Sequence, residues 1–159
     1  MRSLLLALRT VVLATGLMTV ALSNVAYAAP VASTSGGLQG CPRGFWKQLR
    51  HLDSWSFYSP GQTLESVFDV PDAYRVDNIP LLDALSFDGG PTIGDAARNL
   101  VRAGVAGLLN AQSADVNYPI TTSQVIAEVD AAIASGDRTT ILAEANRLEG
   151  MNNLRCPLS

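Results

Sequence analysis

The stretch IGDAARNLVRAGVAGLLNA, residues 93–111, decides the fold class of this 159-residue chain. Its apolar and small residues recur every three or four positions, which is the period of an amphipathic α-helix. The resulting stripe contains Ala97, Leu100, Val101, Gly104, Val105, Leu108 and Leu109. Because the stripe is rich in Ala and Gly, we expect a neighbouring helix to approach it closely.

Two further helices are predicted downstream of this stretch. Thr121-x-x-Gln124 has the pattern of a capping box and precedes an apolar repeat that begins at Val125. Gly136 is typical of the position just after a helix, and Asp137 is a suitable N-cap for the next one.

The residues upstream predict shorter helices. One is expected within Arg43–Trp55, where Phe45 and Leu49 share a helical face. Thr63 is predicted to cap a second short helix, and Pro80 is suited to the first turn of a third. Since no alternating strand pattern of useful length is present, the predicted fold is all-α, a small single-domain helical bundle.

The N-terminal residues have the pattern of a secretory signal peptide over residues 1–28. Arg2 and Arg9 are basic, Val11–Leu22 is apolar, and Ala26-Tyr27-Ala28 matches the cleavage site. A membrane anchor is the alternative, but polar residues interrupt the apolar run. We therefore expect secretion to the exterior of the cell envelope and no membrane insertion after cleavage.

The rest of the chain divides into a leader and one domain. Residues 29–40 are small and polar, which predicts a flexible leader. Residues 41–159 form the predicted helical domain. After cleavage, nine Lys or Arg residues stand against 14 Asp or Glu residues, which argues against nucleic acid as a partner.

Cys41 and Cys156 are the chain's two cysteines and lie at opposite ends of the predicted domain. In an exported protein such a pair predicts an internal disulfide. Two free thiols or an intermolecular bond are the alternatives. An internal bond would place the first helix beside the C-terminal segment, so we expect any working surface there.

The sequence predicts no catalytic residue, metal ligand set or cofactor. His51 is the single histidine, and neither a nucleophile elbow nor a zinc-ligand set accompanies it. A loop rich in side-chain oxygens offers a calcium hypothesis, although its spacing matches no EF-hand. The residues concerned are Asp69, Asp72, Asp77 and Asn78.

Aromatic residues are concentrated between Phe45 and Phe68. Exposed aromatic side chains bind sugars, peptides or protein surfaces, whereas buried ones complete a small core. The candidate binding residues in this segment are Trp46, Lys47, His51 and Trp55. Exposure of the two tryptophans discriminates between the two interpretations.

A set of short motifs resembles an uncharacterised family of secreted bacterial domains, often found at the C-terminal end of cell-surface proteins. The motifs are Cys41-Pro42-Arg43-Gly44-Phe45-Trp46-Lys47, His51, Trp55, Leu81-Leu82-Asp83-Ala84-Leu85, Gly89-Gly90, Leu108-Leu109-Asn110-Ala111, Tyr118-Pro119, Val125-Ile126 and Asn153-Leu154-Arg155-Cys156-Pro157-Leu158. Related sequences carry Arg-His where this chain has Arg102-Ala103. The resemblance implies secretion, the disulfide and the extent of the fold, but no activity.

Two functional hypotheses follow. The first is a secreted non-catalytic module, with a binding or structural role at the cell surface or in the extracellular matrix. Its partner would be an extracellular protein or polysaccharide. The second is an extracellular hydrolase acting on envelope polymers, in which His51 would meet Asp53 or another carboxylate in a cleft.

Overall fold

A computed structural model describes residues 36–159, and the predicted signal peptide and most of the predicted leader lie outside the described residues. The long helix α3 spans Ile93–Gln112, as predicted to within one residue. Thr92 caps it through a capping box with Asp95, which the sequence analysis did not identify. Its buried face is continuous from Ala96 to Asn110.

Two regular helices follow α3 where the sequence predicts them. Helix α4 spans Thr122–Ala134 and begins with the predicted capping box of Thr121 and Gln124. Gly136 then adopts a φ of 61°, a conformation that favours glycine. The side chain of Asp137 accepts a hydrogen bond from the Thr140 amide and so caps α5, Arg138–Asn152.

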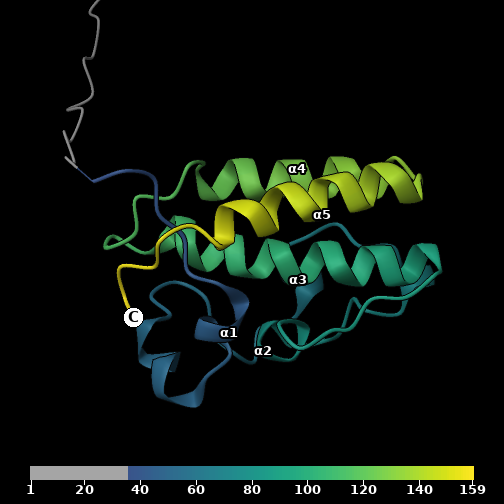
Figure 1. Ribbon diagram of the computed structural model, residues 1–159. Helices are drawn as coiled ribbons and strands as arrows, with labels where there is room; N and C mark the ends of the chain where they lie inside the picture. The colour runs from purple at the N-terminus through teal and green to yellow at the C-terminus, as the bar shows by residue number, and fades with distance from the viewer. Residues whose placement is uncertain (1–35) are drawn as a thin grey trace, which may run out of the picture. The chain divides into compact units, whose positions relative to one another are not determined.

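Helix α3 packs between two sets of segments (Figure 1). Helices α4 and α5 lie on one side of it, and the short helices α1 and α2 lie on the other. A Cβ atom at Gly104 would lie 3.0 Å from Val129 Cγ2 on α4 and 3.1 Å from Phe68 Cζ. The glycine in the stripe therefore permits the close helix approach that the sequence predicts.

The segment before α3 consists of short helical turns. These are α1 at Arg43–Trp46, η1 at Leu49–Ser54, η2 at Leu64–Ser66, η3 at Asp72–Tyr74 and α2 at Leu81–Ala84, where the three η segments are 3₁₀ helices. Pro80 precedes α2 directly, close to its predicted place. The described residues contain no strand beyond two isolated bridges.

Two details of this segment differ from the prediction. The single helical face expected for Phe45 and Leu49 is broken between α1 and η1, so Leu49 is 78% exposed while Phe45 is buried. Thr63 occupies the N-cap position of η2 but makes no capping hydrogen bond. The Leu64 amide instead donates to the carbonyl of Ile79, a contact distant in sequence that periodicity does not reveal.

The described residues belong to one compact helical unit whose ends are joined by the predicted disulfide. Gln39 and Gly40, which the sequence analysis assigns to the leader, are hydrogen-bonded to it. The Gln39 amide donates to Asn117 O and the Gly40 amide donates to Arg155 O. No helix among residues 36–159 combines the length and apolar character needed to cross a bilayer.

Candidate binding groove at the disulfide end

The disulfide brings the first and last segments of the domain together. Cys41 and Cys156 are 115 residues apart in sequence, and their Cα atoms are 4.4 Å apart. Cys41 is fully buried, whereas Cys156 is partly accessible. The region around the bond therefore combines a rigid interior with an accessible exterior.

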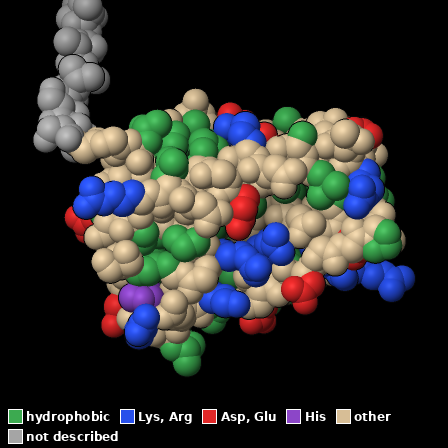
Figure 2. All heavy atoms as spheres, in the orientation of Figure 1, with side chains coloured by type: hydrophobic (Ala, Val, Ile, Leu, Met, Phe, Trp, Pro, Cys, Tyr) green, Lys and Arg blue, Asp and Glu red, His purple; other side chains and the backbone are tan. Residues whose placement is uncertain are grey.

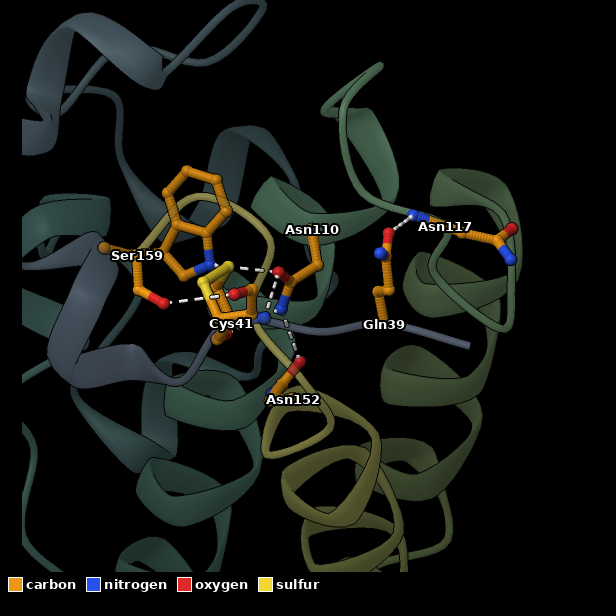
Figure 3. The surroundings of a disulfide bond; sticks show 8 residues. Gln39, Cys41, Asn110, Asn117, Asn152 and Ser159 are labelled. Carbon is orange, nitrogen blue, oxygen red and sulfur yellow. Dashed lines mark hydrogen bonds between the residues drawn. A yellow bond between two sulfur atoms is a disulfide. The ribbon is translucent and has the colours of Figure 1, made fainter. Parts of the chain in front are cut away.

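Asn110 of α3 fixes the interior side of this region. Its Oδ1 accepts hydrogen bonds from the Cys41 amide at 2.7 Å and from Trp46 Nε1 at 3.3 Å. Its Nδ2 donates to the Cys41 carbonyl at 2.8 Å and to Asn152 Oδ1 at 3.0 Å. Figure 3 shows the hydrogen bonds that join the Asn110 side chain to Cys41 and to Asn152. Since all of its donors and both acceptor sites are used, this buried amide holds Cys41 in one position against α3.

Asn152 extends the same network toward the loop that follows α3. Its Oδ1 also accepts a hydrogen bond from the Tyr118 hydroxyl at 2.8 Å, and its Nδ2 donates to Ala103 O at 2.9 Å. Burial raises the pKa of the Tyr118 phenol above its usual range. The phenol is therefore held as a neutral donor, and the end of α5 is tied to α3.

The two predicted binding tryptophans belong to the core. Trp46 is fully buried and Trp55 is 8% exposed. The Trp55 indole N–H donates to the Trp46 carbonyl at 3.2 Å, so both indoles have satisfied polar atoms. Their burial removes the exposed indole surface that a direct contact with a partner would require. The core interpretation of this aromatic segment therefore holds for both tryptophans.

A groove of about 530 Å³ lies on the exterior side of the disulfide. It is formed by α1, η1 and the C-terminal segment. Its lining residues are Pro42, Gly44, Phe45, Gln48, Arg50, His51, Cys156, Leu158 and Ser159. The disulfide thus creates a surface from the two segments that the sequence analysis expected it to bring together.

His51 lies in this groove, and its ring is ordered by two neighbours. It stacks on Phe45 with the ring centroids 3.9 Å apart and the planes 24° from parallel. Its Nε2 accepts a hydrogen bond from Arg50 Nε at 3.2 Å. Figure 2 shows the histidine in purple, with a blue Lys or Arg side chain and red Asp or Glu atoms beside it. Lys47 is exposed and is not among the lining residues.

The chemistry of the groove is apolar with one cation. Phe45, Leu158 and Pro42 supply apolar surface, and Arg50 supplies a permanent positive charge. No Asp or Glu side chain lines it. Within the described residues the side-chain partner of His51 is Arg50, not the carboxylate that a hydrolytic base–acid pair would use. The arrangement suits non-covalent binding of a ligand that has an apolar group and, close to it, a negatively charged group.

The acidic loop considered for calcium forms a separate pocket of about 490 Å³. Asp69, Asp72 and Asp130 line it, whereas Asp77 and Asn78 do not. Burial, followed by the nearby charge of Asp69, raises the pKa of Asp130, although the Asp69 amide donates to its carboxylate. No set of three or more His, Cys, Asp or Glu side chains in the described part of the chain is arranged to hold a metal ion.

The sequence motifs contain six of the nine lining residues of the groove. The other three, Gln48, Arg50 and Ser159, carry no motif that distinguishes them from surface residues. The available signal was the cysteine pair, because it joins the segments on which these residues lie. Asn110 was visible within the Leu-Leu-Asn-Ala motif, but its role as a buried hydrogen-bonding centre was not predicted.

Comparison of the chain with protein-family models, with curated proteins and with solved structures gives no significant match.

Proposed function

We propose that this protein is a secreted, non-catalytic module that binds a partner at the cell surface or in the extracellular matrix through the groove at its disulfide end. The supporting observation is the groove itself, an accessible and largely apolar recess built from the two covalently joined ends of the domain. Disulfides are typical of oxidising, extracellular compartments. The signal-peptide pattern in residues 1–28 also favours export.

The burial of the tryptophans determines which variants can test this proposal. Replacing Trp46 or Trp55 by Ala would leave a large cavity and costs about 3 to 5 kcal/mol, so loss of binding would report unfolding. Arg50 is exposed and lines the groove, so Arg50→Glu changes its chemistry without opening the core. Arg75→Glu is the matched control because Arg75 is also exposed and lies outside the groove.

The experiment is capture of envelope and matrix components by the purified, oxidised protein, with each captured component identified by mass spectrometry. We expect the wild type and Arg75→Glu to retain the same component and Arg50→Glu to lose it. Equal capture by all three proteins would exclude the groove as the binding surface. The absence of any component enriched over a matrix-only control would contradict the binding function.

An extracellular hydrolase acting on envelope polymers is the second candidate, because His51 lies in a recess and not on a convex surface. In such an enzyme His51 would act as the base, but the Arg50 N–H occupies its Nε2 lone pair. Incubation with isolated envelope polymers, followed by chromatography of soluble products, tests this candidate. Products that disappear with His51→Gln would favour the enzyme over the binding module.

A further inference from the structure

The groove differs in charge from the rest of the acidic domain. The segment Cys41–Leu52 contains three basic residues, Arg43, Lys47 and Arg50, and no Asp or Glu. None of the 14 acidic residues of the chain lines the groove. A negatively charged ligand therefore meets no acidic side chain in the lining of this groove.

Arg50 is the group best placed to bind an anion in the groove. Its Nε donates to His51, which orients the guanidinium, and its two terminal Nη groups make no hydrogen bond or ion pair with the described chain. Two parallel N–H donors on a planar group match a carboxylate in a bidentate arrangement. The stacking of His51 on Phe45 makes His51 a positioning residue for Arg50.

Apolar surface lies directly beside this cation. Phe45, Pro42 and Leu158 line the groove. Leu49, which lies between Gln48 and Arg50 in sequence, is 78% exposed but is not among the lining residues. Covering the apolar side chains of the groove with an apolar ligand group is favourable, because it removes apolar surface from water. The ligand therefore needs an apolar group within reach of its negative charge.

A peptide fits these features better than a polysaccharide does. Sugar rings present many hydroxyl groups, which need several side-chain donors and acceptors. The polar side chains of this groove are Gln48, Arg50, His51 and Ser159. The Gln48 amide already donates to Gly44 O, and His51 Nε2 already accepts from Arg50.

We infer that the groove binds an acidic peptide segment in which one Leu or Phe side chain fills the apolar recess and a neighbouring Asp or Glu carboxylate pairs with Arg50. This inference rests on the proposed function, since it names the chemistry of the partner at the same site. His51 orients the guanidinium that receives the carboxylate.

The test uses three acetylated and amidated peptides added to the isotopically labelled, oxidised protein. In the first, a central Leu is flanked by Glu residues. In the second, Lys replaces each Glu, and in the third, Ser replaces the Leu. Nuclear magnetic resonance then follows the Arg50 Nε–H, the His51 ring and the Leu158 methyl groups as each peptide is titrated.

We expect the Glu–Leu peptide to shift these three signals and the other two peptides to shift them at least about tenfold less at equal concentration. Raising the ionic strength from about 0.05 M to about 0.5 M should weaken the binding severalfold, because salt screens an exposed ion pair. Arg50→Glu, which removes the Arg50 signal itself, should abolish the shifts of the His51 ring and of the Leu158 methyl groups. Arg50→Lys should weaken binding, since an ammonium group lacks the planar fork, and Arg75→Glu should leave binding unchanged.

Equal shifts with the Lys peptide, or no shifts at about millimolar concentrations of the Glu–Leu peptide, where even weak binding is detectable, would overturn the inference. Soluble glycan fragments that shift the same signals when the peptides do not would replace it with polysaccharide binding. If envelope capture depends on Arg50 while no peptide binds, the proposed function stands and this inference fails. Peptide binding without envelope capture would support the chemistry inferred for the groove and contradict the proposed binding of an envelope or matrix component.

Discussion

The two halves of the domain are ordered by different means. Helices α3, α4 and α5 have side-chain caps and continuous buried faces, so local sequence specifies each of them. The segment from Gln39 to Leu85 contains helical turns of three to six residues, none with a side-chain cap. Its order depends on the disulfide and on hydrogen bonds to distant residues.

This difference separates a scaffold from a surface. A short turn gains little stability from its own hydrogen bonds, so α1 and η1 would be marginal without tertiary contacts. Asn110 and the disulfide supply those contacts from α3 and from the C-terminal segment. The groove is therefore built from the half that has the least local stability, and the helical half holds it in place.

The largest effect is expected from removal of the disulfide. Replacing both Cys41 and Cys156 by Ser should lower the free energy of unfolding by about 4 to 5 kcal/mol, because the bond closes a loop of 115 residues. Urea denaturation of the double variant and the oxidised wild type measures the difference. Because the N-terminal half depends on the bond more than the helical half does, hydrogen exchange in the double variant should accelerate first in residues 39–55. An unchanged urea midpoint would contradict the role assigned to the bond.

The next effect is expected from Asn110→Ala, which removes the centre of the buried network. Cys41 N, Cys41 O and Trp46 Nε1 would lose their partner, and unsatisfied buried groups cost about 1 to 3 kcal/mol each. We expect a loss of about 3 kcal/mol in urea denaturation. Asn146→Ala is the control because Asn146 is exposed on α5. Equal stability of the two variants would show that the network is dispensable.

A smaller effect distinguishes the capped helices from the uncapped turns. Thr121→Ala should cost about 1 kcal/mol, because the Thr121 side chain accepts from the Gln124 amide at the start of α4. Thr63 occupies the equivalent position of η2 but makes no capping hydrogen bond, so Thr63→Ala should lower the free energy of unfolding by less. Thermal unfolding of the two variants makes the comparison. A larger loss for Thr63→Ala would reverse the assignment of local stability.

The smallest effect concerns alkaline pH. The folded-state pKa of Tyr118 is raised by burial, so its neutral form is favoured by folding. This contribution is fully present below the unfolded pKa of about 10 and is lost as the pH rises toward the folded pKa. Tyr118→Phe should be less stable at neutral pH, because the bond to Asn152 is lost, but should lose less stability between about pH 9 and about pH 11.

Melting temperatures measured across that pH range provide the readout. Tyr74→Phe is the control, since the Tyr74 hydroxyl makes no hydrogen bond within the described chain and is only partly buried. If Tyr118→Phe and the wild type lose stability in parallel as the pH rises, Tyr118 does not contribute to the alkaline transition.

The sequence predicted the scaffold better than the surface for a physical reason. The bounds of α3, the capping box at Thr121 and the positive φ of Gly136 follow from interactions within a few residues. Leu49 has the right spacing for a buried face, yet it is exposed because α1 ends after one turn. Tertiary contacts decide that break, and they leave no periodic signal.

The sequence predicted where the candidate site lies, but not the full set of residues that line it. The cysteine pair indicated that the first helix and the C-terminal segment would meet, and the structure confirms this. The aromatic cluster suggested Trp46 and Trp55 as contacts, but the indoles complete a core whose other side chains are mainly Ala, Val and Leu. Arg50 and Leu158 become notable when the folded chain places them on one recess.

The most direct test of the binding surface is hydrogen–deuterium exchange of the oxidised protein with and without its captured envelope component. The account predicts slower exchange in residues 42–51 and 156–159, the two segments that contribute the lining of the groove, and unchanged exchange in α4. Protection confined to α4 and α5, with no change around the groove, would contradict it.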